Sequence, residues 1–119
     1  MDLLKKLQAD LAAFAAERDW DQFHTPKNLA MALSGEAGEL LELFQWLTPE
    51  QSERNALSNE SVKAIEDEMA DVLLYLLRLA DKLQVDVTVA AQAKLKLNAE
   101  KYPIEKSKGN AIKYSRREK

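Results

Sequence analysis

The chain contains no cysteine, and its 119 residues include only three glycines, three prolines and one histidine. The lack of cysteine excludes disulfide bonds, thiolate metal sites and cysteine nucleophiles. No apolar run approaches the roughly 20 residues that a membrane-spanning helix needs. The first ten residues, MDLLKKLQAD, lack the apolar stretch and the cleavage site of a secretion signal. We therefore expect a cytoplasmic protein with no membrane partner.

The chain is rich in hydrophobic residues, at 46%, and in charged residues, at 31%. This composition and length are typical of one folded domain. The charge is uneven, because residues 1–100 carry 10 basic and 18 acidic side chains whereas residues 101–119 carry 7 basic and 2 acidic ones. We assign residues 1–104 to one all-α domain and residues 105–119 to a basic tail. This tail is interpreted as a solvated end, a nucleic-acid patch or a segment that reaches an anionic ligand bound elsewhere on the molecule.

Apolar residues recur at spacings of three and four along the chain, and the sustained alternation typical of a β-strand is missing. Thr25 is expected to cap the second helix, with Pro26 as its first residue, and Asp86 is expected to cap the fourth. A short helical turn is predicted in the connection TPEQSERNALSNES. The sequence thus predicts an all-α four-helix bundle, with helices over about residues 2–18, 26–47, 60–83 and 87–102.

Acidic residues interrupt the apolar stripes of the second and third predicted helices. At about 100° per residue, Glu36 lies in the middle of one stripe and Glu39 at its edge. Glu68 and Asp71 flank the other stripe. Since the apolar stripes must pack together, the four acids are expected to converge on one cleft. Buried carboxylates are costly unless they are paired, protonated or metal-bound, and no lysine or arginine on either stripe is placed to neutralise four of them. The pattern therefore indicates a divalent cation, and its all-oxygen ligands favour Mg²⁺ or Mn²⁺ over zinc.

Two alternatives to a catalytic metal site follow from the same residues. A single ExxE pair usually marks a solvated helix face, and an acidic stripe can also serve a basic partner. The chain would then be a non-catalytic helical interaction module with an acidic cleft. A di-iron oxidase is not expected, because such bundles use Glu-x-x-His on two helices, and the single histidine, His24, lies in a predicted loop.

Two glycines, Gly35 and Gly38, lie in the same predicted helix as the first acidic pair. A glycine inside a helix costs about 0.5–1 kcal/mol relative to alanine, so a local reason is expected. Gly38 lies between the two acids, and we predict that it lets another helix or a ligand approach the backbone closely.

The two acidic pairs, Glu36-Ala-Gly-Glu39 and Glu68-Met-Ala-Asp71, form an ExxE…ExxD pattern with 28 residues between them. This pattern resembles the all-α nucleoside triphosphate pyrophosphohydrolases of the MazG-like superfamily. Four longer segments resemble the dCTP pyrophosphatase group within it, so that the resemblance covers about residues 11–115. These segments are RDWDQFHTPKNLAMALSGEAGELLELFQW, DEMADVLLYLLRLAD, KLKLNAEKYP and SKGNAIKYS.

The resemblance implies Mg²⁺-dependent hydrolysis of a (deoxy)nucleoside triphosphate to the monophosphate and pyrophosphate, as house-cleaning of the nucleotide pool. It implies dCTP or a related pyrimidine triphosphate as substrate, and a homodimer or homotetramer as the assembly. Nucleic acid is not an expected partner. Some members of the group carry a histidine on the first helix, near the base pocket, where this chain has Leu11. The resemblance therefore implies the type of reaction more strongly than it implies which base is preferred.

The resemblance also assigns roles to individual residues. The four acids Glu36, Glu39, Glu68 and Asp71 are implied to bind the metal, and Glu39 is our candidate for the general base. Further positions match residues that contact the substrate. These are Lys94 and Asn98 facing the phosphates, and Trp20, His24, Trp46 and Tyr75 around the nucleotide pocket.

Overall fold

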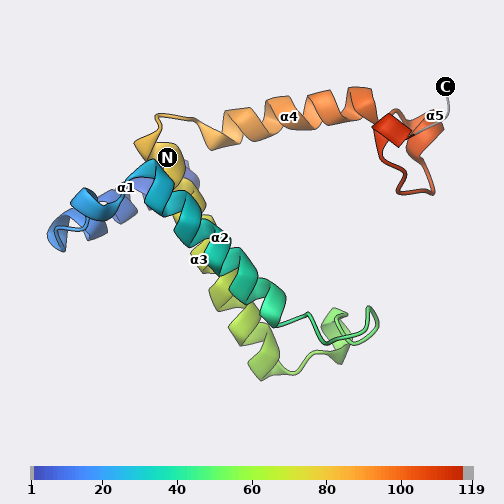
Figure 1. Cartoon of the computed structure of the whole chain (residues 1–119), viewed down its shortest axis with the longest axis horizontal. Helices are drawn as coiled ribbons and strands as arrows, with labels where there is room; N and C mark the ends of the chain where they lie inside the picture. The colour runs from blue at the N-terminus through green and yellow to red at the C-terminus, as the bar shows by residue number, and fades with distance from the viewer. Residues whose placement is uncertain (1, 117–119) are drawn as a thin grey trace. The chain divides into compact units, whose positions relative to one another are not determined.

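The computed structural model of the chain describes residues 2–116 and is α-helical, with no β-strand in that range (Figure 1). The predicted all-α fold is therefore confirmed. Met1 and residues 117–119, which end the predicted basic tail, lie outside the described residues. The chain divides into two compact units, residues 1–85 and 86–119. Within its described part, no helix is both long enough and apolar enough to cross a bilayer.

The first unit contains three α-helices, each started by a polar side chain. The Asp2 carboxylate accepts a hydrogen bond from the Leu4 backbone N–H at 3.0 Å at the start of α1. Thr25 caps α2, with Pro26 as its first residue, as predicted, and Ser58 caps α3. These caps satisfy N–H groups that the first turn of a helix leaves unpaired. The helices are α1 (Leu3–Glu17), α2 (Pro26–Glu42) and α3 (Asn59–Lys82), with short 3₁₀ turns η1 (Asp21–Phe23) and η2 (Arg54–Ala56) between them.

The second helix ends at Glu42 and not near residue 47, so this predicted boundary is wrong. The Leu43 and Phe44 backbone N–H groups bond to carbonyl groups three residues earlier, which tightens the last turn. Thr48 and Gln51 then exchange two side-chain-to-backbone hydrogen bonds, of 2.9 and 3.1 Å, and begin a new turn. The spacing of hydrophobic residues did not reveal that these hydrogen bonds would end the helix early.

Helices α2 and α3 run antiparallel and pack along each other, while α1 packs on α3 (Figure 1). The Gln8 side-chain amide of α1 donates to the Leu77 carbonyl of α3 at 2.9 Å. The fully buried apolar core is small, and several large apolar side chains of this unit are exposed. The buried residues are Ala15, Leu29, Ile65, Leu77 and Ala80, and the exposed ones include Met31, Leu41, Trp46 and Met69.

The two helical glycines make no close approach within the described chain. A Cβ atom added at Gly35 or at Gly38 would meet no atom within 4 Å. No helix of the first unit therefore approaches Gly38, and the approach of a ligand or of another helix at Gly38 stays a prediction. The space beside it is open to a ligand or to a second molecule.

The second unit contains α4 (Val87–Lys101), α5 (Ile104–Ser107) and the turn η3 (Tyr114–Arg116). Asp86 caps α4 through the Val89 backbone N–H at 3.0 Å, and the helix ends before Pro103, both as predicted. The Tyr114 ring packs edge-to-face on Tyr102 with 6.0 Å between centroids, and the Tyr114 N–H donates to the Tyr102 hydroxyl at 3.3 Å. The described part of the basic tail, residues 105–116, thus folds back on the end of α4.

Candidate functional site

Three acids from two helices meet in the first unit. Glu36 and Glu39 lie one turn apart on α2, and Glu68 lies on the facing helix α3. Each offers a carboxylate oxygen, and these three oxygens all lie within 4.8 Å of one another. The packing of the two apolar stripes therefore brings three of the four predicted metal ligands together.

The carboxylates of this cluster lack compensation from the protein. One oxygen of Glu36 and one of Glu68, both Oε2, are buried and have no hydrogen-bond partner within residues 2–116. The nearby Glu68 carboxyl, together with burial and the neighbouring Glu39 carboxyl, raises the pKa of Glu36 to about 7. None of the ion pairs formed within the described chain involves these acids.

This donor set fits a hard divalent cation. Carboxylate oxygens are the ligands that Mg²⁺ and Mn²⁺ prefer, and two positive charges would compensate acids that the protein leaves unpaired. The orphaned oxygens of Glu36 and Glu68 are the observation behind this fit. The cluster can therefore hold a metal ion.

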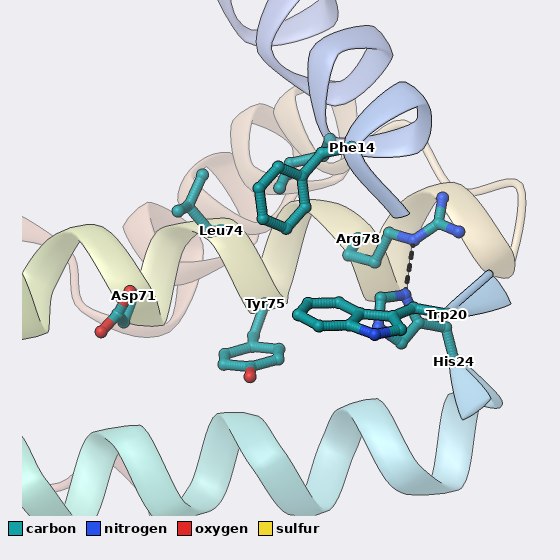
Figure 2. A pocket seen from close by; sticks show the side chains of 8 residues that line it. Phe14, Trp20, His24, Asp71, Leu74, Tyr75 and Arg78 are labelled. Atoms are coloured by element: carbon teal, nitrogen blue, oxygen red, sulfur yellow. Dashed lines mark hydrogen bonds between the residues drawn. The ribbon is translucent and has the colours of Figure 1, made fainter. Parts of the chain in front are cut away.

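A pocket of about 220 Å³ lies along α3, with Asp71, Tyr75 and Arg78 of that helix in its wall (Figure 2). Asp71, the fourth predicted ligand, lines this pocket and is not part of the three-acid cluster. It follows Glu68 by one helical turn, so the same helix passes from the cluster to the pocket. The lining residues are Leu11, Phe14, Trp20, His24, Asp71, Leu74, Tyr75 and Arg78.

Aromatic rings make up much of the pocket wall. Trp20 packs edge-to-face on Phe14 at 5.7 Å, and its ring lies 6.4 Å from that of His24, tilted by 59°. Tyr75 projects from α3 into the same space (Figure 2). Such walls suit a flat aromatic ligand, because every nucleobase has a face that can stack on an aromatic ring.

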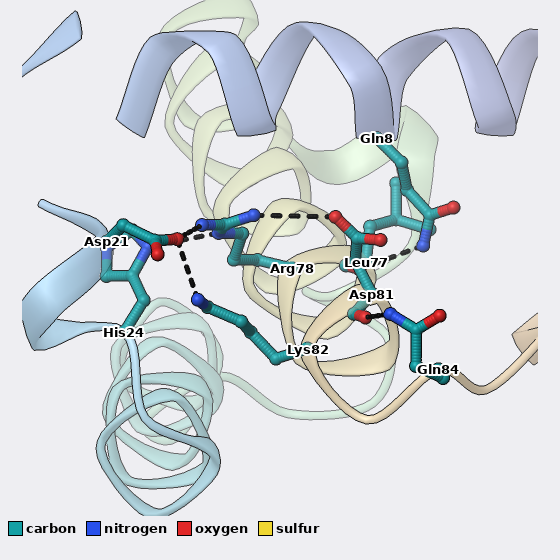
Figure 3. Close-up of polar contacts among 8 residues, drawn as sticks. All are labelled: Gln8, Asp21, His24, Leu77, Arg78, Asp81, Lys82 and Gln84. Atoms are coloured by element: carbon teal, nitrogen blue, oxygen red, sulfur yellow. Dashed lines mark hydrogen bonds and ion pairs between the residues drawn. The ribbon is translucent and has the colours of Figure 1, made fainter. Parts of the chain in front are cut away.

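A polar network ties the loop after α1 to the end of α3 (Figure 3). Arg78 is only 6% exposed, and its guanidinium bonds to Asp21 at 2.6 Å, to His24 at 3.1 Å and to Asp81 at 3.4 Å. Lys82 reaches the same Asp21 oxygen at 2.7 Å. The hydrogen bond from Lys82 and the charges of both cations lower the pKa of Asp21. Burial and the same cations lower the pKa of His24.

Arg78 is the residue of this site that sequence reasoning missed. A signal was present, because Glu68, Asp71, Tyr75 and Arg78 follow one another at spacings of three, four and three. These spacings put all four side chains on one stripe of α3. An arginine at the edge of an apolar stripe usually extends into water, whereas this one bonds to Asp21 and His24 of the segment between α1 and α2.

The predicted substrate residues fall into three groups. Trp20, His24 and Tyr75 line the pocket together. Trp46 follows α2, is 87% exposed and is not among the lining residues. Lys94 and Asn98 lie four residues apart on one face of α4, in the second unit, and their role at the phosphates stays a prediction.

Comparison with known proteins gives consistent matches. Residues 31–116 match the MazG-like family. The dCTP pyrophosphatase 1 proteins of Bos taurus and Homo sapiens are 47% and 44% identical over 104 residues, which are 87% of this chain but only 62% and 61% of those proteins. The chain thus spans about three fifths of the length of these relatives. A crystal structure of a pyrophosphatase from Archaeoglobus fulgidus is 39% identical, with a TM-score of 0.79 over 87% of this chain and 94% of that one.

Proposed function

The chain belongs to the MazG-like family, and from this premise we propose that it hydrolyses a nucleoside triphosphate to the monophosphate and pyrophosphate. The observation that supports this most is the acid cluster with its two unpaired buried oxygens, joined by α3 to an aromatic pocket. A triphosphate needs both a site for metal-bound phosphates and a site for its base. The names of the relatives add dCTP, or a related pyrimidine triphosphate, as the proposed substrate.

The proposed cofactor is Mg²⁺, with Mn²⁺ as a substitute, held by Glu36, Glu39 and Glu68, with Asp71 as a fourth ligand. When bound, such an ion neutralises phosphate oxygens and acidifies a water molecule. Glu39 is the exposed member of the cluster and is the proposed base that takes the proton of the attacking water. Glu36 and Glu68 are more buried than Glu39, and their proposed role is to bind the metal ion. Positioning and charge neutralisation are the main needs of phosphoryl chemistry.

The substrate is proposed to extend from the acids to the pocket. Its base would stack between the aromatic side chains at Trp20 and Tyr75, with the polar edge of His24 beside it. Lys94 and Asn98 are proposed to contact the phosphates. Trp46 is proposed to contact the nucleotide of a neighbouring subunit, since it does not line the pocket of its own chain.

The proposed function is tested by incubating the protein with a panel of ribo- and deoxyribonucleoside triphosphates and Mg²⁺. We expect monophosphate and pyrophosphate in equal amounts, with the fastest turnover for a pyrimidine deoxynucleotide. An assay with EDTA in place of Mg²⁺ is the matched control. If no triphosphate is turned over, the interaction module with an acidic cleft becomes the better explanation.

The bond that breaks can be identified with labelled water. In H₂¹⁸O, attack at the α-phosphorus should put the isotope into the monophosphate and leave pyrophosphate unlabelled. Mass spectrometry of both products measures this in one reaction. Release of orthophosphate with a nucleoside diphosphate would contradict the proposed cleavage.

The basic segment is proposed to neutralise the distal phosphates together with Lys94. Replacing Lys108 and Lys113 with glutamine keeps the chain length and the contact between Tyr102 and Tyr114. We expect the variant to have a higher KM for the triphosphate than the wild-type protein. The difference between the two KM values should shrink as salt screens the charges. An unchanged KM at low salt would favour a solvated end, and loss of salt-sensitive DNA or RNA binding in a gel-shift assay would favour a nucleic-acid patch.

We also propose a homodimer or homotetramer in the cytoplasm. The small core and the exposed apolar side chains of the first unit support a partner surface, since contiguous exposed apolar residues commonly mark interfaces. Light scattering coupled to gel filtration measures the molar mass. A mass of one chain at micromolar concentration would contradict the proposed assembly.

A further inference from the structure

The contact between Arg78 and His24 controls which hydrogen bonds the pocket can make. Arg78 Nε lies 3.1 Å from His24 Nδ1, inside the network that also holds Asp21 (Figure 3). A guanidinium group has five N–H donors and no acceptor, and it stays charged at all relevant pH values. The imidazole atom that faces it must therefore be an acceptor.

This requirement fixes the chemical form of His24. If Nδ1 accepts, it carries no proton, and the ring is neutral with its single N–H at Nε2. Protonating Nδ1 would break the bond to Arg78 and would place a second cation beside Arg78 and Lys82. Burial and those two charges lower the pKa of His24, while only Asp21 acts in the opposite direction. Every charged group near the ring except Asp21 thus favours the neutral form.

The free donor belongs to the pocket. His24 Nε2–H donates to no group within residues 2–116, and His24 lines the pocket beside Trp20. Arg78 is held on its other side by Asp21 and Asp81, which keeps its Nε–H directed at the imidazole. A ligand that fills the pocket removes water from this N–H, and an N–H left without a partner then costs free energy, so a ligand that supplies an acceptor is favoured over one that does not.

We infer that Arg78 is a specificity-determining positioning residue, which fixes His24 as an N–H donor so that the pocket selects a ligand edge carrying a hydrogen-bond acceptor. The carbonyl oxygen and the unprotonated ring nitrogen of a pyrimidine edge are acceptors of this kind. The inference depends on the proposed function only for the identity of the ligand as a nucleotide. The hydrogen-bond polarity of the pocket is a property of the protein alone.

The polarity is measured by NMR on the full chain without nucleotide. Because the chain has one histidine, a tag-free ¹⁵N-labelled sample gives one imidazole signal set. We expect an unprotonated Nδ1, a protonated Nε2 and a coupling through the hydrogen bond between Arg78 Nε and His24 Nδ1. The ring should titrate below its ordinary pKa of 6.5. A protonated Nδ1 in the wild-type protein, or no coupling together with an ordinary pKa, would overturn the inference.

Three variants separate this role from a structural one. Arg78→Met removes the donor, so the coupling should vanish and the pKa of His24 should rise towards its ordinary value. Arg78→Lys retains a group that only donates, so it should keep Nδ1 unprotonated. Lys82→Met breaks the other ion pair to Asp21 and is the matched control, which should retain the coupling. If Arg78→Met does not fold, the wild-type protein and the other two variants still decide the question.

Kinetics then test the effect on ligand choice. Arg78→Met should raise KM for the preferred triphosphate roughly 2–10-fold, with kcat nearly unchanged. This is the loss expected when the hydrogen bond from His24 Nε2–H to the ligand is made only part of the time. Arg78→Lys should recover part of the loss. The role in specificity would be overturned by an unchanged KM in a variant for which NMR shows that His24 has lost its hydrogen bond to residue 78. If the NMR results hold and no nucleotide is hydrolysed, the proposed function fails and the assignment of His24 stands.

Discussion

Replacing Glu68 with glutamine is expected to reduce turnover roughly 100-fold or more while leaving the fold intact. The amide keeps the shape of the side chain but removes one of the four carboxylates proposed to hold the metal ion. A 100-fold loss corresponds to about 2.7 kcal/mol of transition-state stabilisation. The metal-free variant should also unfold at a higher temperature, because Glu68 Oε2 is buried without a partner in the described chain. Steady-state kinetics, calorimetric titration with Mn²⁺ and thermal unfolding measure these three effects.

The matched control is Glu66→Gln, which removes the same charge from an exposed position two residues away on α3. It should change neither the affinity for Mn²⁺ nor turnover by more than about twofold. Near-normal turnover in Glu68→Gln would contradict the assignment of the acid cluster as the metal site. Equal losses in both variants would indicate a general charge effect along α3.

The metal-free protein is expected to lose stability as the pH rises from 5 to 8. The pKa of Glu36 is raised to about 7 from an ordinary 4.5, so between these values the folded state keeps a proton that the unfolded state has released. Folding is therefore less favoured at each higher pH in this window, and the loss is complete above about pH 7. Added Mg²⁺ should reverse the loss, and it should raise the unfolding temperature more at pH 8 than at pH 5, because it binds ionised carboxylates.

The control for this prediction is Glu36→Gln, whose stability should lack this part of the pH dependence. His24 acts in the opposite direction, because its lowered pKa makes the folded state gain stability as the pH rises towards 6.5. The lowered pKa of Asp21 matters only near and below pH 3.8 and lies outside the window. The difference between wild type and variant therefore isolates Glu36. Identical pH profiles for the two proteins would contradict the assigned coupling between Glu36 and Glu68.

The helices and the meeting of three acids could be predicted because both depend on helical periodicity. Thr25 and Asp86 are caps recognisable from residue type and the spacing that follows. Glu36 lies in the middle of an apolar stripe, and the stripe had to face α3, so its carboxylate was expected to face Glu68. Local pattern and tertiary packing agree at these positions.

The part of the pocket wall that Arg78 forms could not be predicted from helical periodicity, because it depends on contacts between distant parts of the chain. Arg78 is buried and donates hydrogen bonds to Asp21 and His24, which precede it by 57 and 54 residues. Periodicity indicates which side of α3 the arginine occupies, but it does not indicate which loop covers that side. The role of Trp46 at the nucleotide, which the resemblance implied, stays a prediction, and the structure leaves this side chain exposed after the early end of α2.

The acid cluster and the pocket occupy different parts of α3, and this separation affects how such a protein can diversify. Glu68 and Arg78 are ten residues apart on this helix, about 15 Å, and the acid cluster involves α2 whereas the pocket involves α1 and the loop that carries Trp20. Substitutions in that loop or at Leu11 reshape the pocket without touching a residue of the cluster. The residues proposed for base preference and those proposed for hydrolysis are thus separate except for Asp71, so a duplicated gene could change the proposed base preference while its acid cluster stays the same.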